Sequence, residues 1–238
     1  MPDDRKFTLE EKAVRLAQLG TLFICAGMAV QAETAVERLT EAHHVIHEIM
    51  DAPDKGIPQD LLEKAHCIVV VPGLKKGAFI VGGKYGKGFM SCRKGSGVGW
   101  STPAAMRVEG GSFGFQIGGS ETDAVMLVMN ERGASKLMSS KFTLGGDASV
   151  AAGPVGRSAS ANTDAKMQAE VLTYSRSRGA FAGVALDGAT LRPDGEGNKE
   201  LYGNDKLETK EIVMSKMKTP ESARAFVSTL NKLSRVEQ

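Results

Sequence analysis

Ile68-Val69-Val70-Val71-Pro72-Gly73 decides the fold class of this 238-residue chain. Its four β-branched residues end at a proline and a glycine, a pattern typical of a buried β-strand. From here to Val128, short apolar segments alternate with glycine-rich turns. Segments spaced so closely leave no room for crossover helices, which predicts a mostly antiparallel sheet. We expect its strands at residues 68–71, 77–81, 88–92, 98–101, 112–117 and 124–129, with two more at 147–152 and 181–186.

Helical patterns occur in the sequence both before and after the expected strands. Residues 33–50 place apolar side chains along one helical face, namely Val36, Leu39, His43, Ile46 and Met50. Shorter helices are predicted at 60–65 and 131–139, and the turn-rich residues 193–198 predict a loop. Near the carboxyl end, Thr219-Pro220-Glu221 is typical of a helix start. These elements predict one α+β domain over residues 33–238. We expect a curved, mostly antiparallel sheet or partly closed β-barrel, flanked by amino- and carboxyl-terminal helices.

An apolar, uncharged segment runs from Leu19 to Val30. It ends in Val30-Gln31-Ala32, a pattern that a signal peptidase accepts, and it is short for a membrane span. We therefore expect residues 1–32 to be a signal peptide and the protein to reach the periplasm or cell envelope after cleavage near Ala32. Acidic residues before this segment are unusual for a signal peptide, and the alternative is a buried helix of a cytoplasmic protein.

Cys67 and Cys92 would remain after cleavage. Each lies in an apolar run, where cysteine often serves as a small hydrophobic residue. An oxidising compartment would allow the two to pair, but we expect unpaired thiols.

The strongest physical signal is a segregation of charge. The formal net charge is only +2, so the chain has no strong overall field. No Asp or Glu occurs from Lys64 to Val108, yet this acid-free stretch contains Lys75, Lys76, Lys84, Lys87, Arg93, Lys94 and Arg107. On alternating strands and turns, several of these side chains could share one rim and face anionic lipid, at about 1 kcal/mol for each charge. A solvated basic face without a ligand is the alternative.

A second set of candidate anion contacts lies later in the chain. The run 174–188 begins with Tyr174-Ser175-Arg176-Ser177-Arg178 and continues into small residues and glycines. Its arginines could hold an anion, whereas Phe181, Val184 and Leu186 are expected in the sheet core. Upstream, Gly153-Pro154-Val155-Gly156-Arg157 predicts a tight turn that carries Arg157 outward.

Signals for catalysis or metal binding are weak. His43 and His47 share one helix face, as a metal pair would, but no third ligand is evident near them. We find no nucleophile elbow that supports an esterase and no phosphate loop ending in Gly-Lys-Ser/Thr. We therefore expect a non-enzymatic protein without metal or cofactor. Nucleic acid is not an expected partner, because the chain lacks helix-turn-helix and RNP-type motifs and has only 5% aromatic residues.

Taken together, the motifs resemble the SYLF domain family, a lipid-binding module also described as an actin-binding domain in fungal endocytic proteins. The resemblance begins near Ile57-Pro58 and runs almost to the carboxyl terminus. Its landmarks follow one another in order: Ile68-Val69-Val70-Val71-Pro72, Gly82-Gly83-Lys84-Tyr85-Gly86-Lys87-Gly88, Trp100-Ser101-Thr102-Pro103-Ala104, Gln116-Ile117-Gly118, Gly153-Pro154-Val155-Gly156-Arg157, the run 174–188, Asn198 and Tyr202-Gly203.

The resemblance implies binding of phospholipid membranes, with phosphatidylinositol lipids favoured in eukaryotic members, and actin binding in some fungal members. It implies no catalytic residues. An exported member of bacterial type would meet neither actin nor phosphoinositides, so anionic phospholipid is the expected partner. The alternatives are a protein-interaction module, either binding actin-like filaments or serving as a structural envelope protein, and a carrier that encloses a lipid tail.

For the membrane-binding function, the expected head-group contacts are basic. The first cluster consists of Lys75, Lys76, Lys84, Lys87, Arg93 and Lys94, and the second of Arg157, Arg176 and Arg178.

Overall fold

The computed structural model of the protein describes residues 32–52, 56–79, 81–95, 98–113, 118–139, 141–156, 169–177, 180–183, 186 and 188–234. Chain contacts separate residues 1–33 from a compact unit of residues 34–238. Every element discussed below belongs to this second unit. The expected signal peptide lies outside the described residues, apart from Ala32.

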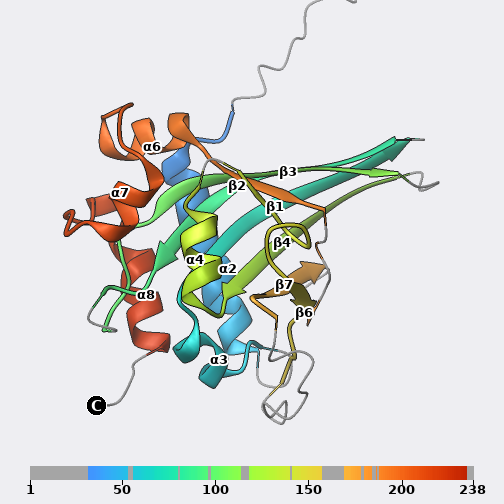
Figure 1. Ribbon diagram of the computed structural model, residues 1–238, viewed down its shortest axis with the longest axis horizontal. Helices are drawn as coiled ribbons and strands as arrows, with labels where there is room; N and C mark the ends of the chain where they lie inside the picture. The colour runs from blue at the N-terminus through green and yellow to red at the C-terminus, as the bar shows by residue number, and fades with distance from the viewer. Residues whose placement is uncertain are drawn as a thin grey trace, which may run out of the picture. The chain divides into compact units, whose positions relative to one another are not determined.

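Among the described residues, nine strands form one sheet (Figure 1). Along the sheet the order is β5-β9-β3-β2-β1-β4-β7-β6, and β8 pairs with β7. The strands are β1 (Cys67–Phe79), β2 (Val81–Cys92), β3 (Ala104–Phe113), β4 (Gly118–Val128), β5 (Phe142–Thr143), β6 (Val150–Ala152), β7 (Val171–Ser177), β8 (Ala180–Gly183) and β9 (Thr190–Pro193). The pairs are antiparallel except β6 with β7. The predicted α+β class with a mostly antiparallel sheet is confirmed.

The sheet curls until its outer strands approach each other. β5 and β6 stand at opposite ends of the strand order, yet only residues 144–149 separate them in the chain. Leu144 and Ala148 in this link form a β-bridge. Phe142 from one side and Val171 from the other lie in the same buried cluster. The result is a partly closed barrel, as predicted.

Side chains alternate along each strand, so the two faces of the sheet carry separate cores. On the outer face, Ile68 and Val70 pack with the helices α2 (Ala35–Asp51), α3 (Gln59–Lys64) and α8 (Arg224–Leu233). On the inner face, Val69 and Val71 pack with α4 (Glu131–Leu137) and α7 (Thr209–Met214). The predicted flanking helices are therefore present, and α2 and α8 contact each other. None of the described helices is both long and apolar enough to cross a bilayer.

Helix α2 begins with a capping box. The Thr34 hydroxyl accepts a hydrogen bond from the Glu37 backbone N–H at 3.2 Å, and the Glu37 carboxylate accepts one from the Thr34 N–H at 2.9 Å. Its buried stripe consists of Ala35, Leu39, Ala42, Val45, Ile46 and Ile49. The predicted face is wrong at Val36, which is 43% exposed, because alanines allow the helix to pack closely along a rotated stripe.

Strand β1 passes through Pro72-Gly73, where a strand end was predicted. The register shifts between Val71 and Leu74, and Gly73 adopts a φ of 55°, so a β-bulge bends the strand without ending it. The expected strand at 98–101 is also wrong, because this segment contributes only an isolated bridge from Trp100 to Arg93. Residues 114–117 of another expected strand lie outside the described residues.

The turn-rich residues 193–198, predicted as a loop, lead into helix α6 (Gly195–Tyr202). The Asn198 side chain accepts a hydrogen bond from the Ala105 backbone N–H at 2.7 Å. A Cβ atom at Gly197 would lie 2.8 Å from the Ala105 Cβ, so glycine lets the helix approach β3. These tertiary contacts outweigh the low helix propensity of glycine.

Cys67 and Cys92 occupy directly opposite positions on β1 and β2, are buried and form a disulfide. The expectation of unpaired thiols is therefore wrong. Strand register brings the two sulfur atoms together, and register cannot be read from the apolar runs that contain them.

Candidate binding surface at the projecting end of the sheet

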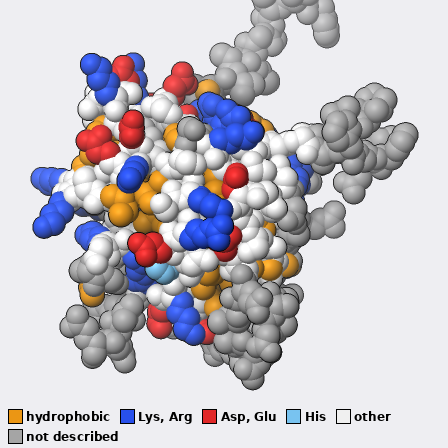
Figure 2. Space-filling model, in the orientation of Figure 1, with side chains coloured by type: hydrophobic (Ala, Val, Ile, Leu, Met, Phe, Trp, Pro, Cys, Tyr) orange, Lys and Arg blue, Asp and Glu red, His pale blue; other side chains and the backbone are white. Residues whose placement is uncertain are grey.

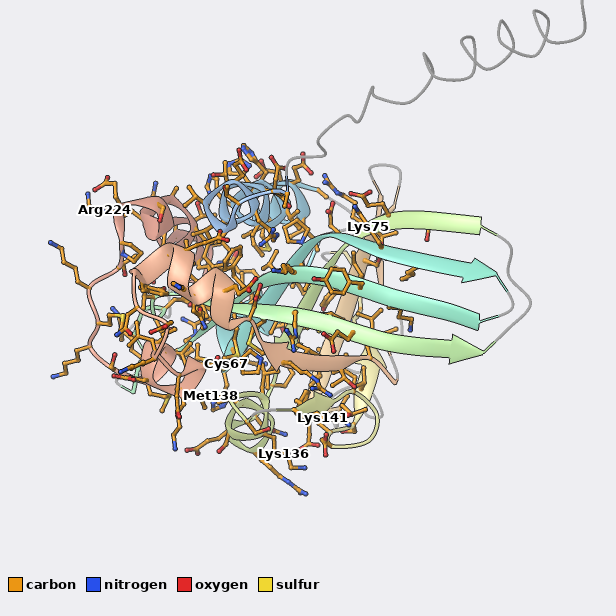
Figure 3. The ribbon with its side chains drawn as sticks, turned by 90° about the horizontal axis from the view of Figure 1, so that it is seen from above. Cys67, Lys75, Lys136, Met138, Lys141 and Arg224 are labelled. Carbon is orange, nitrogen blue, oxygen red and sulfur yellow. A yellow bond between two sulfur atoms is a disulfide. The ribbon has the colours of Figure 1, made fainter. Side chains whose placement is uncertain are left out.

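The four central strands extend beyond their neighbours (Figure 1). β9 pairs with β3 only at Met106–Glu109, and β7 pairs with β4 only at Asp123–Val128. We call the parts beyond these contacts the projecting end: residues 75–79, 81–85, 110–113 and 118–122. Figure 3 shows Cys67 and Lys75 toward opposite ends of β1, with Cys67 among the helices and Lys75 near the region where the strands leave them.

Lys76 and Lys84 lie directly opposite each other on β1 and β2. They share the inner face of the sheet, because Leu74, two residues before Lys76, belongs to the inner core. Burial lowers the pKa of Lys76, and the neighbouring Lys84 ammonium lowers it further. Like charges directly opposite each other destabilise a strand pair. An anion between the two ammonium groups would offset that repulsion.

Lys75 and Lys87 lie on the outer face near the same end. Lys75 is exposed and stands opposite Tyr85 on one side and Glu121 on the other. The Lys87 Nζ atom lies 3.1 Å from the Asp194 Oδ2 atom. The four lysines are therefore divided between the two faces of the sheet and do not share one rim.

Arg93 and Lys94 lie at the other end of β2. The Arg93 guanidinium donates hydrogen bonds to four carbonyl oxygens at 2.9–3.3 Å, those of Leu62, Glu63, Ala65 and Ser234. It also stacks over the Trp100 ring, 4.5 Å from the centroid. Burial lowers the pKa of Arg93. This side chain ties α3 to the residue after α8, whereas Lys94 is exposed.

Arg176, from the second predicted cluster, joins three elements. Its Nε atom donates to Asp123 Oδ2 on β4 at 2.6 Å, and its guanidinium also pairs with Glu48 on α2. Burial raises the pKa of Asp123, whose Oδ1 atom accepts a hydrogen bond from the Gly73 N–H at 3.0 Å. Arg176 is therefore part of an ion-pair network that joins β7, β4 and α2 within the protein. Arg157 and Arg178 lie outside the described residues.

Carboxylates from outside the acid-free stretch pair with its basic residues. Asp194 contacts Lys87, and Glu109 lies 3.0 Å from Arg107. On the face in Figure 2, Lys and Arg side chains are interspersed with Asp and Glu. Sequence reasoning missed Asp194 because it lies far along the chain, at the start of α6. It missed Glu109 because this residue lies just after the acid-free stretch, two positions from Arg107 on β3. Among the described residues, none of the ion pairs involves Lys75, Lys76 or Lys84.

The histidines of α2 contact neighbouring side chains. His43 Nδ1 lies 3.2 Å from the Thr229 hydroxyl on α8, and His47 Nδ1 lies 2.8 Å from Asp51 Oδ2. Burial lowers the pKa of His43, and His44 and His47 lower it further. Within the described part of the chain, no three His, Cys, Asp or Glu side chains are grouped to hold a metal ion.

Comparison with known proteins gives the family of this chain. The Ysc84 family, described as "Las17-binding protein actin regulator", matches residues 109–233, more than half of the chain. The chain belongs to this family. The match confirms the resemblance drawn from the ordered sequence motifs.

The relatives of this Ysc84-family chain are longer proteins. SH3 domain-containing YSC84-like protein 1 of Xenopus laevis is 34% identical over 182 residues, which are 76% of this chain and 54% of that protein. LAS seventeen-binding protein 3 of Saccharomyces cerevisiae is 37% identical over 171 residues, 70% of this chain and 36% of that protein. Protein YSC84 of the same yeast is 35% identical over 180 residues, 74% and 38% respectively. The chain thus spans about half the length of its vertebrate relative and less of the yeast proteins.

Proposed function

We propose that this Ysc84-family chain is a non-enzymatic module that binds anionic phospholipid membranes through its projecting end. The opposed pair Lys76 and Lys84 carries the proposal, because a bound phosphate would offset the repulsion between them. Lys75 adds a third cation nearby, on the other face. At about 1 kcal/mol for each charge, three lysines would strengthen membrane binding by about two orders of magnitude.

Vesicle flotation tests this function. We expect the protein to float with vesicles that contain phosphatidylglycerol and to stay unbound with pure phosphatidylcholine. High salt should release the bound protein, because salt screens exposed charges. Equal binding to both vesicle types, or binding that salt does not change, would contradict the electrostatic mechanism.

A protein-interaction module is the second candidate function, and the strand edges of the projecting end favour it. In the described residues, Gly110–Phe113 of β3 and Gly118–Thr122 of β4 have a partner strand on one side only. Such edges can add a strand from another protein. The family description names an actin regulator, which makes an actin-like filament the first partner to test.

Co-sedimentation with filamentous actin separates this function from lipid binding. Saturable pelleting with filaments, unchanged in Lys76→Gln/Lys84→Gln, would support a protein-binding edge. Absence of pelleting at micromolar protein would remove the actin-like filament as partner.

A carrier that encloses a lipid tail has less support. The inner face of the curled sheet is covered by buried side chains, including Met90, Met126, Phe142 and Leu191. This packing favours a function at the surface over one in the interior.

We also propose that the protein is exported and cleaved near Ala32, which would place residues 33–238 in the periplasm or cell envelope. The Cys67–Cys92 disulfide supports this location, since structural disulfides persist in oxidising compartments. Mass spectrometry of the protein from fractionated cells should find a new amino terminus at Glu33. An uncleaved protein in the cytoplasm would contradict the proposal.

A further inference from the structure

The inner face of the projecting end carries charge of a single sign. Among the described residues of this face, Lys76 and Lys84 are the charged ones. Glu109 and Glu121 belong to the outer face, because each adjoins an inner-face residue in its own strand. Within the described residues, the lysine pair therefore has no carboxylate beside it on this face. The row of the sheet that contains the pair runs across β3, β2, β1 and β4 as Gly110, Lys84, Lys76 and Ser120.

Lys76 is partly buried as well as opposed by a like charge. It lies two residues after Leu74, which is fully buried in the inner core, so the Lys76 side chain starts at the rim of that core. The Cβ atoms of directly opposite residues on antiparallel strands lie about 5 Å apart, and Lys84 holds that position. Burial, and then the Lys84 ammonium, lower the pKa of Lys76. Both features of the fold therefore favour the neutral amine at Lys76.

A lysine in such surroundings is a nucleophile. Only the neutral amine attacks a carbonyl carbon, and the neutral fraction at a given pH rises as the pKa falls. Desolvation and a neighbouring cation are two features that activate lysines for Schiff-base formation in proteins. Lys76 has both features, whereas Lys94 and Lys141 are exposed.

We propose that Lys76 forms a Schiff base with an aldehyde that also carries an anionic group. The Lys84 ammonium, directly opposite, binds the anionic group and so places the carbonyl carbon beside the Lys76 amine. The two lysines thus have different roles: Lys84 keeps its proton and binds, whereas Lys76 loses a proton and reacts. The adduct is a modification of the protein and involves no catalytic turnover.

The reaction balances without an oxidant or a reductant. The Lys76 amine nitrogen forms a bond to the carbonyl carbon and gives a carbinolamine. The former carbonyl oxygen then leaves as water, with the two protons of the amine, and a C=N double bond replaces the C=O double bond. Water reverses the reaction, so the adduct persists only while the aldehyde is present.

Two sources can supply an aldehyde of this kind. One is a soluble metabolite that carries a phosphate or a carboxylate. The other is an anionic membrane that contains phospholipid with an acyl chain cleaved by oxidation to an aldehyde. The second source rests on the membrane-binding function proposed above, whereas the first does not.

The test labels the full chain with pyridoxal 5′-phosphate, traps the adduct with borohydride and locates it by peptide mass spectrometry. At about pH 7 we expect Lys76 to be labelled at least about fivefold faster than Lys94. The pH of half-maximal labelling should also be lower for Lys76. Propionaldehyde, which has no anionic group, should show a smaller preference for Lys76. Equal labelling of the two lysines by pyridoxal phosphate would overturn the inference.

Lys84→Gln isolates the role of the opposite lysine. It should slow the labelling of Lys76 at least about fivefold and raise the pH of half-maximal labelling, because it removes both the anion contact and the like charge. Lys141→Gln removes one exposed charge elsewhere and should leave both values unchanged. Inorganic phosphate should slow the labelling of Lys76 in the wild type, which tests the site without a substitution. An unchanged rate in Lys84→Gln, or with saturating phosphate, would contradict the role of Lys84.

Phosphatidylglycerol vesicles that contain an aldehyde-bearing phospholipid give the second arm of the test. A selective adduct at Lys76 with pyridoxal phosphate supports a soluble source, and an adduct with the vesicles alone supports a lipid source. Absence of both overturns the inference.

Failure of this inference is distinguishable from failure of the proposed function. If the protein floats with phosphatidylglycerol vesicles but Lys76 reacts no faster than Lys94, the reactive lysine is overturned and the membrane function stands. If pyridoxal phosphate labels Lys76 selectively but the protein does not float, the membrane function is overturned and the reactive lysine stands.

Discussion

At the scale of single residues, Arg93 shows how a basic side chain can serve the backbone instead of a ligand. Carbonyl groups at the ends of helices lack partners within the helix. The guanidinium of Arg93 supplies donors to the carbonyls of Leu62 and Glu63 near the end of α3 and to that of Ser234 after α8. A planar fork of N–H groups can reach several carbonyls at once, which a lysine ammonium cannot.

Arg93→Lys should therefore lower the free energy of unfolding by about 2–3 kcal/mol, because several charge-assisted hydrogen bonds are lost. Urea unfolding measures the change. The neighbouring exposed Lys94→Gln should stay within about 0.5 kcal/mol of the wild type. An unchanged unfolding midpoint for Arg93→Lys would show that the side chain does not hold the helix ends.

Gly153 is a second residue with a steric role. A Cβ atom there would lie 2.1 Å from the ring of the buried Tyr174. Gly153→Ala should lower the free energy of unfolding by about 2–3 kcal/mol through overpacking. Gly146→Ala is the control, because its Cβ would meet Thr143 at an ordinary 3.5 Å. Equal thermal stability of the two variants would contradict the packing described for Tyr174.

At the scale of elements, the sequence predicts those elements that have a local pattern and misses those that depend on tertiary contacts. The first β-branched run and the helix at 131–139 carry their own patterns, and both were predicted. The passage of β1 through Pro72-Gly73 depends on its pairing with β2 and β4. Helix α6 likewise depends on the contact between Asn198 and Ala105. No spacing of apolar residues reports such long-range partners.

The Cys67–Cys92 disulfide joins β1 to β2 and spans 25 residues of sequence. In the chain-entropy account, removing a cross-link that closes a loop of this size lowers the free energy of unfolding by about 3 kcal/mol. We expect Cys67→Ala/Cys92→Ala to show this loss in urea, and to lose its sensitivity to added reductant. If reductant leaves the unfolding of the wild-type protein unchanged, the two cysteines are not paired in solution.

Docking of α2 should depend on pH through His43. Burial lowers the pKa of His43 from its ordinary value of 6.5, so the unfolded chain takes up this proton at a higher pH than the folded protein does. The His43 contribution to the free energy of unfolding is therefore complete above pH 6.5, the ordinary pKa of histidine. It is lost as the pH falls from there through the lower pKa of the folded protein. His43→Gln should flatten the decline in unfolding free energy between about pH 7 and about pH 5. The same slope in variant and wild type would assign the decline to other groups.

At the scale of the whole molecule, the acid-free stretch shows a run of basic residues but not how the fold distributes them. In the structure, Lys75, Lys76 and Lys84 lie at one end of the sheet, with Lys75 on the opposite face from the other two. Their role in head-group binding stays a prediction. The stretch does not show that one long strand separates Lys84 from Lys94. Cys92, the last residue of β2, lies roughly 26 Å along the strand from Lys84, and Lys94 follows two residues later. The stretch also does not reveal that Lys87 pairs with Asp194, because Asp194 lies more than 100 residues later in the chain, at the start of α6.

The most direct test of the membrane-binding function compares equal losses of charge at two places. Lys76→Gln/Lys84→Gln removes the opposed pair, and Lys94→Gln/Lys141→Gln removes two exposed lysines away from the projecting end. Flotation on phosphatidylglycerol vesicles at low salt should fall at least about tenfold for the first variant and little for the second. Equal losses in the two variants would show that membrane affinity depends on net charge alone, and would contradict a binding surface at the projecting end.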